Sequence, residues 1–419
     1  MNDAKIINDP VFGFIRIPRG LLYDIVKHPL FQRLTRISQL GLASVVYPGA
    51  RHTRFQHSLG AFHLMTEALL TLQQKGQFIF DSEAEAVQAA ILMHDIGHGP
   101  FSHVLEHTLI SGISHEDISL MMMEQINHDL HDQLALAIAV FRDDYPKHFL
   151  HQLISSQLDM DRLDYLRRDA FFTGVAEGTI GSARIIKMLN VVDDRLVVEQ
   201  KGIYSLENYL TSRRLMYWQV YLHKTTVAYE KMLVSTLRRA KYLARQCTMN
   251  NEQCTMNNEQ CRVFASPALA YFLYNDVDAH RFHDDPMALR MYGELDDSDI
   301  WCAIKVWRHS DDKILARLAG DLLDRRLWRC EMSNEAPDAA HVDELRNHLA
   351  AAMDVSIGDT DYLMQLVSAE KDMYSPTEDS IDILMKDGTI SDITHASELL
   401  NSQSLHTGHV RRYYLCYCR

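Results

Sequence analysis

Four short segments carry residue types that could act together in chemistry. They are RHTRFQHSLG (51–60), HDIGHGPFSH (94–103), SHED (114–117) and DMDRLDYLRRD (159–169). His94 and Asp95 are adjacent, and an imidazole beside a carboxylate offers mixed nitrogen and oxygen donors to a divalent ion. His57 and Asp161 could complete such a site from neighbouring helices. Two histidines and two carboxylates leave positions open for water and a phosphate oxygen, which is what metal-assisted hydrolysis requires.

Three further histidines surround the predicted ligands. His98 follows His94 by four residues, about one helical turn, so we expect it to face the same cleft. His103 lies on the loop that follows, and His115 opens the next predicted helix. Because none of the three is needed as a ligand, we interpret them as candidates for acid–base work or phosphate contacts.

Each motif also has a purely structural interpretation. A His-Asp pair is common, and His98 or His103 taken alone is more often a helix cap. Arg54 could be a surface arginine, and Asp161 could belong to a solvated helix start. The functional interpretation rests on the co-occurrence of all four motifs, in this order and at compatible separations.

The elements that must position these motifs are mainly helices. Apolar residues recur at intervals of three and four through most of the chain, which is typical of amphipathic helices. The expected helices cover 21–41 (divided at Pro29), 57–75, 83–97, 115–126, 130–143, 146–155, 182–189, 205–245 (one long helix or a broken pair) and 266–330. We expect a small β-hairpin or extended arm at 5–19, a β-hairpin at 191–199, a helical and loop mixture at 340–372, and short strands within 379–419.

The predicted fold class is therefore mainly α, a helical core with small β-hairpins and a C-terminal α+β lobe. We expect a core with an N-terminal arm over 1–245 and a C-terminal helical and α+β region over 262–419. Between them, 246–261 reads QCTMNNE twice and then QC, an exact tandem duplication. Cysteines seven apart could share a helix face and hold a metal, but His and Asp partners are missing, so we interpret this as a polar helix end or loop.

Composition excludes several classes of protein. The 419 residues include 42 basic and 56 acidic side chains, a net charge of −14, which disfavours nucleic acid or an anionic membrane as the main partner. No apolar run reaches the roughly 18 residues of a membrane span, and the N-terminus lacks a secretory pattern. Seven cysteines without a disulfide framework predict a reducing, cytoplasmic location.

Taken together, the motifs resemble those of the HD-domain metal-dependent phosphohydrolases. Within them, the chain resembles the deoxynucleoside triphosphate (dNTP) triphosphohydrolases of the sterile-alpha-motif/HD type and their bacterial relatives. The similarity is dense over 6–232 and weaker through 295–307 and 324–329. It implies a divalent metal cofactor (Mn, Fe, Mg or Zn), a nucleotide substrate, release of deoxynucleoside and inorganic triphosphate, and a homo-oligomer.

The HD core alone leaves alternatives open. One is a phosphomonoesterase or phosphodiesterase acting on another nucleotide. Another is a nucleotide-sensing or nucleic-acid-binding protein with a vestigial site. The complete ligand set argues against lost catalysis.

The resemblance also assigns residue roles. It makes His57, His94, Asp95 and Asp161 the metal ligands. It makes His103 the general acid or the residue that orients the leaving oxygen, and His98 and His115 neighbours of the α-phosphate. It assigns phosphate contacts to Arg54, Arg162, Tyr165 and Arg213, and sugar or base contacts to Gln39, Leu40, Asp169 and Tyr221. Structural alternatives are helix-end packing for Gln39 and Leu40, core packing for Tyr221 and a solvated face for Arg213.

One segment departs from the family pattern. In KHPLFQRLTR (27–36), Gln32 and Arg33 are kept. However, Lys27 stands where the nucleotide-activated vertebrate enzyme has an acidic base-reading residue, and Thr35 stands where it has an arginine. Lysine cannot accept the hydrogen bonds that guanine offers. We therefore hypothesise that activation by guanine nucleotides is absent or altered.

Overall fold

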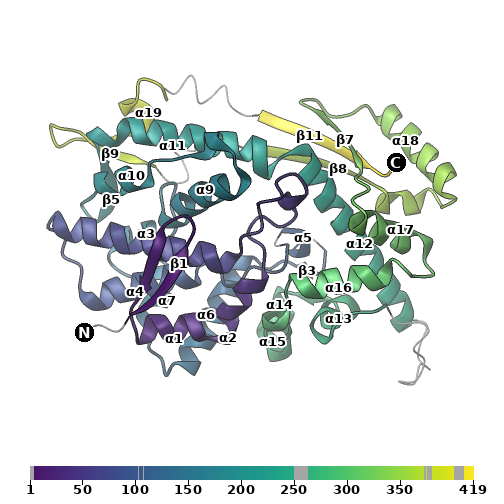
Figure 1. Cartoon of the computed structure of the whole chain (residues 1–419), viewed down its shortest axis with the longest axis horizontal. Coiled ribbons are helices and arrows are strands. Elements are labelled where there is room, and N and C mark those ends of the chain that lie inside the picture. Colours follow the sequence, from purple (N-terminus) through teal and green to yellow (C-terminus); the bar gives the residue numbers. More distant parts are fainter. Residues whose placement is uncertain are drawn as a thin grey trace.

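The computed structural model describes residues 4–101, 103–106, 108–249, 263–371, 374, 380–400 and 410–419. It is mainly helical, as the sequence predicts (Figure 1). Most of the duplicated tract 246–261 lies outside the described residues, and its first residues end a long helix. No helix in the described ranges combines the length and apolar character needed to cross a membrane.

The N-terminal arm is the expected hairpin of β1 (Lys5–Asp9) and β2 (Gly13–Ile17). The helical stretch that follows is divided at Pro29, as predicted, into α1 (Leu21–Lys27) and α2 (Pro29–Gln32), with a 3-10 turn η1 (Arg33–Arg36). Its predicted extension to residue 41 is wrong. The chain becomes extended at 37–39 and pairs with 52–54, where the amide of Arg54 donates to the carbonyl of Ile37 at 3.0 Å.

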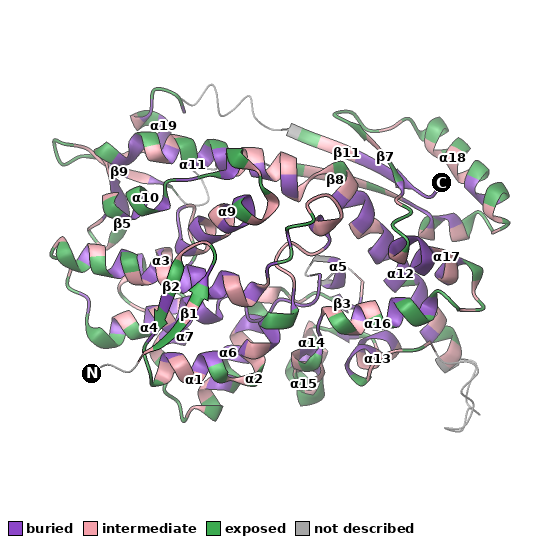
Figure 2. Cartoon of the chain, in the orientation of Figure 1, coloured by how far each residue is buried: buried purple, intermediate pink, exposed green. Residues whose placement is uncertain are grey.

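Six helices build the core around the motifs. They are α3 (Arg54–Gln74), α4 (Asp81–Met93), α6 (His115–Asp129), α7 (Ala135–Phe141), α8 (His148–Gln152) and α9 (Met160–Thr173). Helix α3 packs against both α4 and α9, and α4 packs against α7. Buried residues follow the inner faces of these helices (Figure 2), so the motif-bearing ends meet inside one hydrophobic core.

A small sheet lies beside this core. After α10 (Ser182–Met188), β4 (Leu189–Val192) and β5 (Arg195–Glu199) form the predicted hairpin, and both turn aspartates, Asp193 and Asp194, have positive φ. Then α11 (Ile203–Met216), a π-helical turn η5 (Tyr217–Tyr221) and α12 (Lys224–Met249) form the broken pair of helices.

Most of the C-terminal region packs on α12. Its helices are α13 (Pro267–Tyr274), α14 (Ala279–Asp284), α15 (Pro286–Glu294), α16 (Asp297–Trp307), α17 (Lys313–Leu323) and α18 (Ala339–Met353). Strands β7 (Arg329–Ser333), β11 (Val410–Tyr417) and β8 (Met364–Lys371) form an antiparallel sheet in that order. Strand β8 lies where we expected a helical and loop mixture, because its pairing with the distant β11 extends it.

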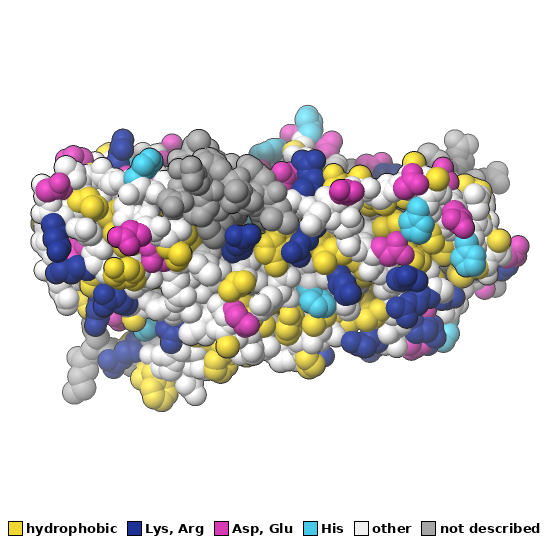
Figure 3. All heavy atoms as spheres, turned by 90° about the horizontal axis from the view of Figure 1, so that it is seen from above, with side chains coloured by type: hydrophobic (Ala, Val, Ile, Leu, Met, Phe, Trp, Pro, Cys, Tyr) yellow, Lys and Arg dark blue, Asp and Glu magenta, His cyan; other side chains and the backbone are white. Residues whose placement is uncertain are grey.

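A second C-terminal segment returns to the core. Strands β9 (Asp382–Leu384) and β10 (Ile390–Asp392) join the β4–β5 hairpin in the order β10-β9-β5-β4, and β9 runs parallel to β5. On the face seen in Figure 3, acidic and basic side chains are interspersed with apolar ones.

Candidate metal centre and its surroundings

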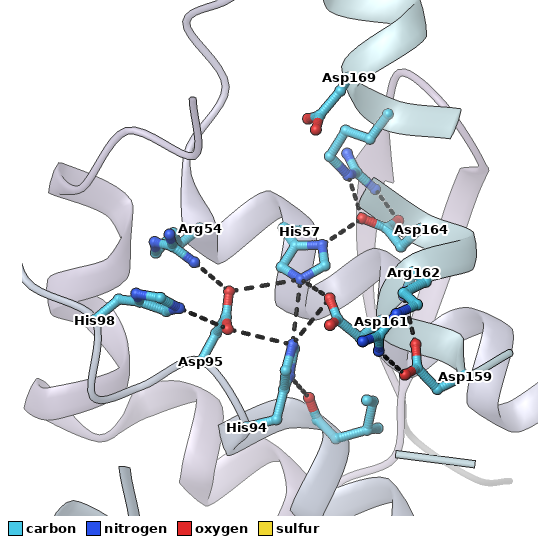
Figure 4. Close-up of polar contacts among 12 residues, drawn as sticks. Arg54, His57, His94, Asp95, His98, Asp159, Asp161, Arg162, Asp164 and Asp169 are labelled. Atoms are coloured by element: carbon cyan, nitrogen blue, oxygen red, sulfur yellow. Dashed lines mark hydrogen bonds and ion pairs between the residues drawn. The ribbon is translucent and has the colours of Figure 1, made fainter. Parts of the chain in front are cut away.

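Three helix ends bring the sequence motifs together (Figure 4). The first turn of α3 supplies His57, the residues just after α4 supply His94 and Asp95, and the first turn of α9 supplies Asp161. The start of α3 is fixed by a capping contact in which the amide of Thr53 donates to the side chain of the third helical residue at 2.9 Å. The start of α9 is fixed by an aspartate N-cap.

Hydrogen bonding fixes the proton positions of two imidazoles. His94 Nδ1 lies 2.7 Å from the carbonyl oxygen of Ile91, and His57 Nδ1 lies 2.7 Å from Asp164 Oδ2. Both partners only accept, so each Nδ1 carries the proton and each Nε2 of a neutral ring is a lone pair. The two Nε2 atoms are 3.2 Å apart, and Asp161 Oδ1 lies 3.0 Å and 3.4 Å from them.

Two imidazole nitrogens and a carboxylate this close together need a cation among them, either a proton or a metal ion. Burial lowers the pKa of His57, but hydrogen bonds to Asp161 and Asp164 outweigh it and raise this pKa to about 10. Burial opposes ionisation of Asp161, yet His57 and His94 hold the pKa of this carboxyl far below its usual range. The donor set therefore fits a divalent ion, and His57, His94 and Asp161 form its tightest group.

Asp95 lies beside this group and is shared with cationic partners. Its oxygens are 3.5 Å from His94 Nε2 and 3.6 Å from His57 Nε2, and it is ion-paired with Arg54. It also lies 3.2 Å from His98 Nε2. Burial and the charge of Arg54 lower the pKa of His98 to about 3, against the opposing effect of Asp95. Burial and the Arg54 charge therefore favour the neutral form of His98.

The next histidine on the cleft is His115, at the start of α6. Its ring stacks on that of His98 with 4.0 Å between centroids. Helix α6 is held here by Ser119, whose hydroxyl donates to the carbonyl of His94 and accepts from the amide of Gly97, both at 2.9 Å. His103 begins the short helix α5 (His103–Glu106), but its side chain lies outside the described residues.

Residues assigned to the sugar reach the site through the pairing of 37–39 with 52–54. Gln39 follows the bridge between Ser38 and Thr53, and its amide donates to the carbonyl of His52 at 3.0 Å. Gln39 Oε1 is buried and has no hydrogen-bond partner in the described part of the chain. Leu40 is half-buried beside it. An unsatisfied buried acceptor is the kind of group that a ligand hydroxyl would satisfy.

Two arginines, Arg162 and Arg213, form a basic group close to Asp161. Arg162 is ion-paired with Asp159, and Arg213 Nη1 donates to Gln157 Oε1 at 2.7 Å. The buried Nε of each arginine has no partner among the described residues. Burial raises the pKa of Tyr165 well above its usual value, and the two guanidinium charges oppose that rise. Tyr165 therefore lies in the field of both cations.

From Tyr165, a polar chain leads away from the cations. The ring of Tyr165 meets that of Tyr221 edge-on at 6.2 Å, and the Tyr221 hydroxyl donates to Asp169 Oδ2 at 2.8 Å. Asp169 Oδ1 also lies 2.7 Å from His52 Nε2, and His52 stacks on Phe172. Sequence reasoning missed His52, although its place in RHTR, two residues before Arg54, was a usable signal.

In the segment that departs from the family pattern, Arg33 and Gln32 donate hydrogen bonds to backbone carbonyls. The guanidinium of Arg33 is fully buried and donates to the carbonyls of Leu295 at 2.8 Å and Ile96 at 3.3 Å. Gln32 donates to the carbonyl of Val26 at 2.7 Å. Lys27 is exposed and pairs with Asp24 one turn earlier.

Comparisons with known proteins identify the family of the chain. The family model of the HD domain matches residues 54–169, and the model of the HD associated region matches 180–270. An uncharacterized protein of Bacillus subtilis, YwfO, is 30% identical over 96% of this chain and 90% of its own length. The human deoxynucleoside triphosphate triphosphohydrolase SAMHD1 is 30% identical over 57% of this chain and 45% of its own.

A homologue of SAMHD1 from Dictyostelium discoideum is also 30% identical, over 57% of this chain. The chain spans about half the length of both triphosphohydrolases. Among solved structures, a phosphohydrolase from Bacteroides thetaiotaomicron is 60% identical, covers both chains completely and superposes with a TM-score of 0.93. A hypothetical protein from Aquifex aeolicus is 25% identical over 99% of this chain, with a TM-score of 0.72.

Proposed function

Because the chain belongs to the HD-domain phosphohydrolases, we propose that it uses a divalent metal to hydrolyse dNTPs. The products are the deoxynucleoside and inorganic triphosphate. The observation that carries this proposal is the set of lone pairs on His57, His94 and Asp161 that face one another in a buried site. The similarity to the SAMHD1 triphosphohydrolases supports the choice of substrate.

His57, His94 and Asp161 would hold the ion, with Asp95 as the fourth ligand. When bound, the ion supplies Lewis-acid chemistry that activates water and polarises a phosphate oxygen. Mn, Fe, Mg and Zn all suit this mixture of imidazole and carboxylate donors. Asp95 would exchange part of its contact with Arg54 for the ion, since the two compete for the same carboxylate.

The polyphosphate would lie along the arginines. Arg54, Arg162 and Arg213 neutralise its charge, and the unsatisfied Nε atoms of Arg162 and Arg213 supply donors for its oxygens. Tyr165 lies between these arginines and Tyr221, so it would lie where the triphosphate joins the sugar.

The nucleoside would lie against a wall formed by Gln39, Leu40, Asp169 and Tyr221. Gln39 Oε1 accepts the 3′-hydroxyl, and Leu40 fills the space that a 2′-hydroxyl would need. Asp169 and Tyr221 complete the wall, and their mutual hydrogen bond orients both side chains.

In the reaction, water attacks the α-phosphorus and the bond from that phosphorus to the 5′ oxygen breaks. The oxygen of the water becomes part of the triphosphate, and the proton that it loses passes to solvent. His103 gives its proton to the departing 5′ oxygen, which leaves as the hydroxyl of the deoxynucleoside. His98, stacked on His115, contacts the α-phosphate and supports His103.

Product analysis tests the proposal. The protein is loaded with Mn²⁺ or Mg²⁺ and incubated with each dNTP and each ribonucleotide, and the products are separated by ion-exchange chromatography. We expect deoxynucleoside and triphosphate from dNTPs only. Monophosphate as the product would contradict the triphosphohydrolase assignment and favour another HD-type reaction.

Matched variants show whether the centre is responsible. Asp161→Ala should lower turnover by at least about 10²–10³-fold, the range for loss of one preorganised electrostatic group. His148→Ala removes an exposed histidine that also faces an aspartate, Asp143, at 2.7 Å, and should leave turnover unchanged. A second arm adds dGTP at fixed dATP. Stimulation below twofold is expected, because Lys27 cannot read guanine.

A further inference from the structure

We propose that Asp164, Arg168 and Asp9 form a buried positioning chain that acts through His57 and sets the affinity of the centre for its ion. The inference rests on the metal centre of the proposed function. It makes the N-terminal hairpin, which contributes no predicted ligand, part of the metal site. Figure 4 shows Asp164 on the side of His57 away from the other donors.

The first link is the contact between His57 and Asp164. Asp164 has no exposed surface, and its Oδ2 accepts the Nδ1 proton of His57 at 2.7 Å. A carboxylate on this nitrogen fixes the tautomer, aims Nε2 at the ion and makes the imidazole a stronger donor. Asp164 lies one turn after Asp161 on α9, so one helix supplies both a ligand and the support of a second ligand.

The second link holds Asp164 in place. Arg168, one further turn along α9, donates from Nε to Asp164 Oδ2 at 2.9 Å and from Nη2 to Oδ1 at 3.0 Å. This two-point contact prevents rotation of the carboxylate. Arg168 is itself fully buried, so its charge needs a further partner.

The third link is that partner, Asp9, at the end of β1. Arg168 Nη1 donates to Asp9 Oδ2 at 2.7 Å. Asp9 Oδ1 accepts from the amides of Val11 and Phe12, both at 2.9 Å. The same carboxylate therefore closes the turn of the hairpin and anchors the arginine behind the metal centre.

Helix α3 is shaped to admit this chain. Gly60 lies three residues after His57, and a Cβ at this position would lie 1.9 Å from Asp164 Oδ1 and 2.1 Å from Arg168 Nη2. Only glycine leaves room there for the carboxylate and the guanidinium side by side. The packing of α3 against α9 thus depends on the same pair of side chains that supports the ligand.

The test is the affinity of the apo protein for Mn²⁺, measured by calorimetric titration. We expect Asp164→Asn and Arg168→Met to raise the Kd at least about tenfold, the usual range for losing an outer partner of a ligand. Asp9→Asn should raise it less. Arg168→Lys, which keeps the charge, should recover part of the loss. In Co²⁺-loaded Asp164→Asn, the visible absorption should shift, because the ligand ring is no longer fixed.

The matched control is Arg239→Met. Arg239 is also buried between two carboxylates, with contacts of 2.7 Å to Asp312 and 2.8 Å to Asp359, but it lies in α12 and touches no predicted ligand. This variant should lower the Tm while the Kd stays within twofold of the wild-type value. A purely structural role for Arg168 would make the two variants behave alike.

Folded Asp164→Asn and Asp9→Asn with wild-type Kd values would overturn the proposal. These milder changes carry the test even where Arg168→Met does not fold. A wild-type protein that binds none of Mn²⁺, Fe²⁺, Mg²⁺ and Zn²⁺ would overturn the proposed function as well. Wild-type binding with unaffected variants would overturn only the positioning chain.

Discussion

At the residue scale, the groups around each imidazole decide whether the histidine can bind a metal ion or exchange a proton. His57 and His94 donate hydrogen bonds from Nδ1 to a carboxylate and a carbonyl, so in each neutral ring the lone pair of Nε2 points inward. His98 lies near Asp95 but also in the field of Arg54, which with burial keeps it neutral. His57 and His94 thus share one chemical role in this small site, and His98 has another.

The sugar preference is a prediction at this scale. Leu40→Gly should remove the side chain that we expect to exclude the 2′-hydroxyl. The kcat/KM for ribonucleotides should then rise relative to that for dNTPs by about tenfold or more, the range for small changes in pocket volume. The ratio is measured with dATP and ATP under the same conditions. An unchanged ratio in an active variant would move sugar recognition to other residues.

At the element scale, the start of α6 packs closely against the backbone of Gly97, next to the metal centre. Gly97→Ala would place a Cβ 2.2 Å from the amide nitrogen of Ser119 and 2.3 Å from the carbonyl oxygen of His115. These atoms cannot move without displacing the start of α6. We expect a loss of about 1–3 kcal/mol in stability, typical of overpacking, together with lower kcat, both measured on the same preparation.

Gly181→Ala is the control for this substitution. An added Cβ there meets nothing within 4 Å, and φ at Gly181 is −84°, so stability and kcat should be unchanged. If Gly97→Ala also left stability and kcat unchanged, the position of α6 would not depend on the close contact between Gly97 and the start of α6.

The start of α4 gives a pH-dependent prediction. Buried Glu83 accepts hydrogen bonds from Lys147 at 2.7 Å and Tyr145 at 2.6 Å. Burial raises the pKa of Glu83, but these contacts and the amide of Phe80 outweigh burial and lower it. A lowered folded-state pKa stabilises the protein above the unfolded value of about 4.3 and loses that effect as pH falls.

Glu83→Gln should therefore destabilise by about 1–3 kcal/mol at pH 7, and the difference from wild type should shrink as pH falls below about 4.5. Urea unfolding at several pH values measures both. Glu85→Gln, an exposed change on the same helix, should have no effect at any pH. A difference for Glu83→Gln that stayed constant with pH would exclude the ionised contact as its cause.

Sequence periodicity predicted the helices well, because each buries one face against the core. Local turn chemistry likewise predicted the hairpin at Asp193-Asp194. Sequence could not predict the pairing of β8 with β11, because a strand's partner depends on distant residues. The metal motifs were visible as side-chain types. The residues that support these ligands, such as Arg168, could not be recognised from the sequence. A charged residue on a helix is expected to be exposed, and only the packing of another element against it shows that it is buried.

At the scale of the whole molecule, the ion would join three helix ends. Its binding should stabilise the fold by about 4 kcal/mol at a concentration 1,000 times the Kd. We therefore expect a chelator to lower the Tm by several degrees and added Mn²⁺ to restore it, as measured by calorimetry. In the double variant His57→Ala/Asp161→Ala, the Tm should no longer respond to either. A wild-type Tm that changes neither with the chelator nor with added Mn²⁺ would contradict the predicted metal centre.

The parallel pairing of β5 with β9 has a consequence for biosynthesis. Val198 lies opposite Ile383, about 185 positions later in the chain. While the ribosome is still making the intervening helices, the nascent hairpin β4–β5 has an open edge that can pair with another chain. Such distant contacts form late and slowly. We therefore expect newly made chains to associate through this edge of β5. We also expect a chaperone to cover the edge until the last strands emerge.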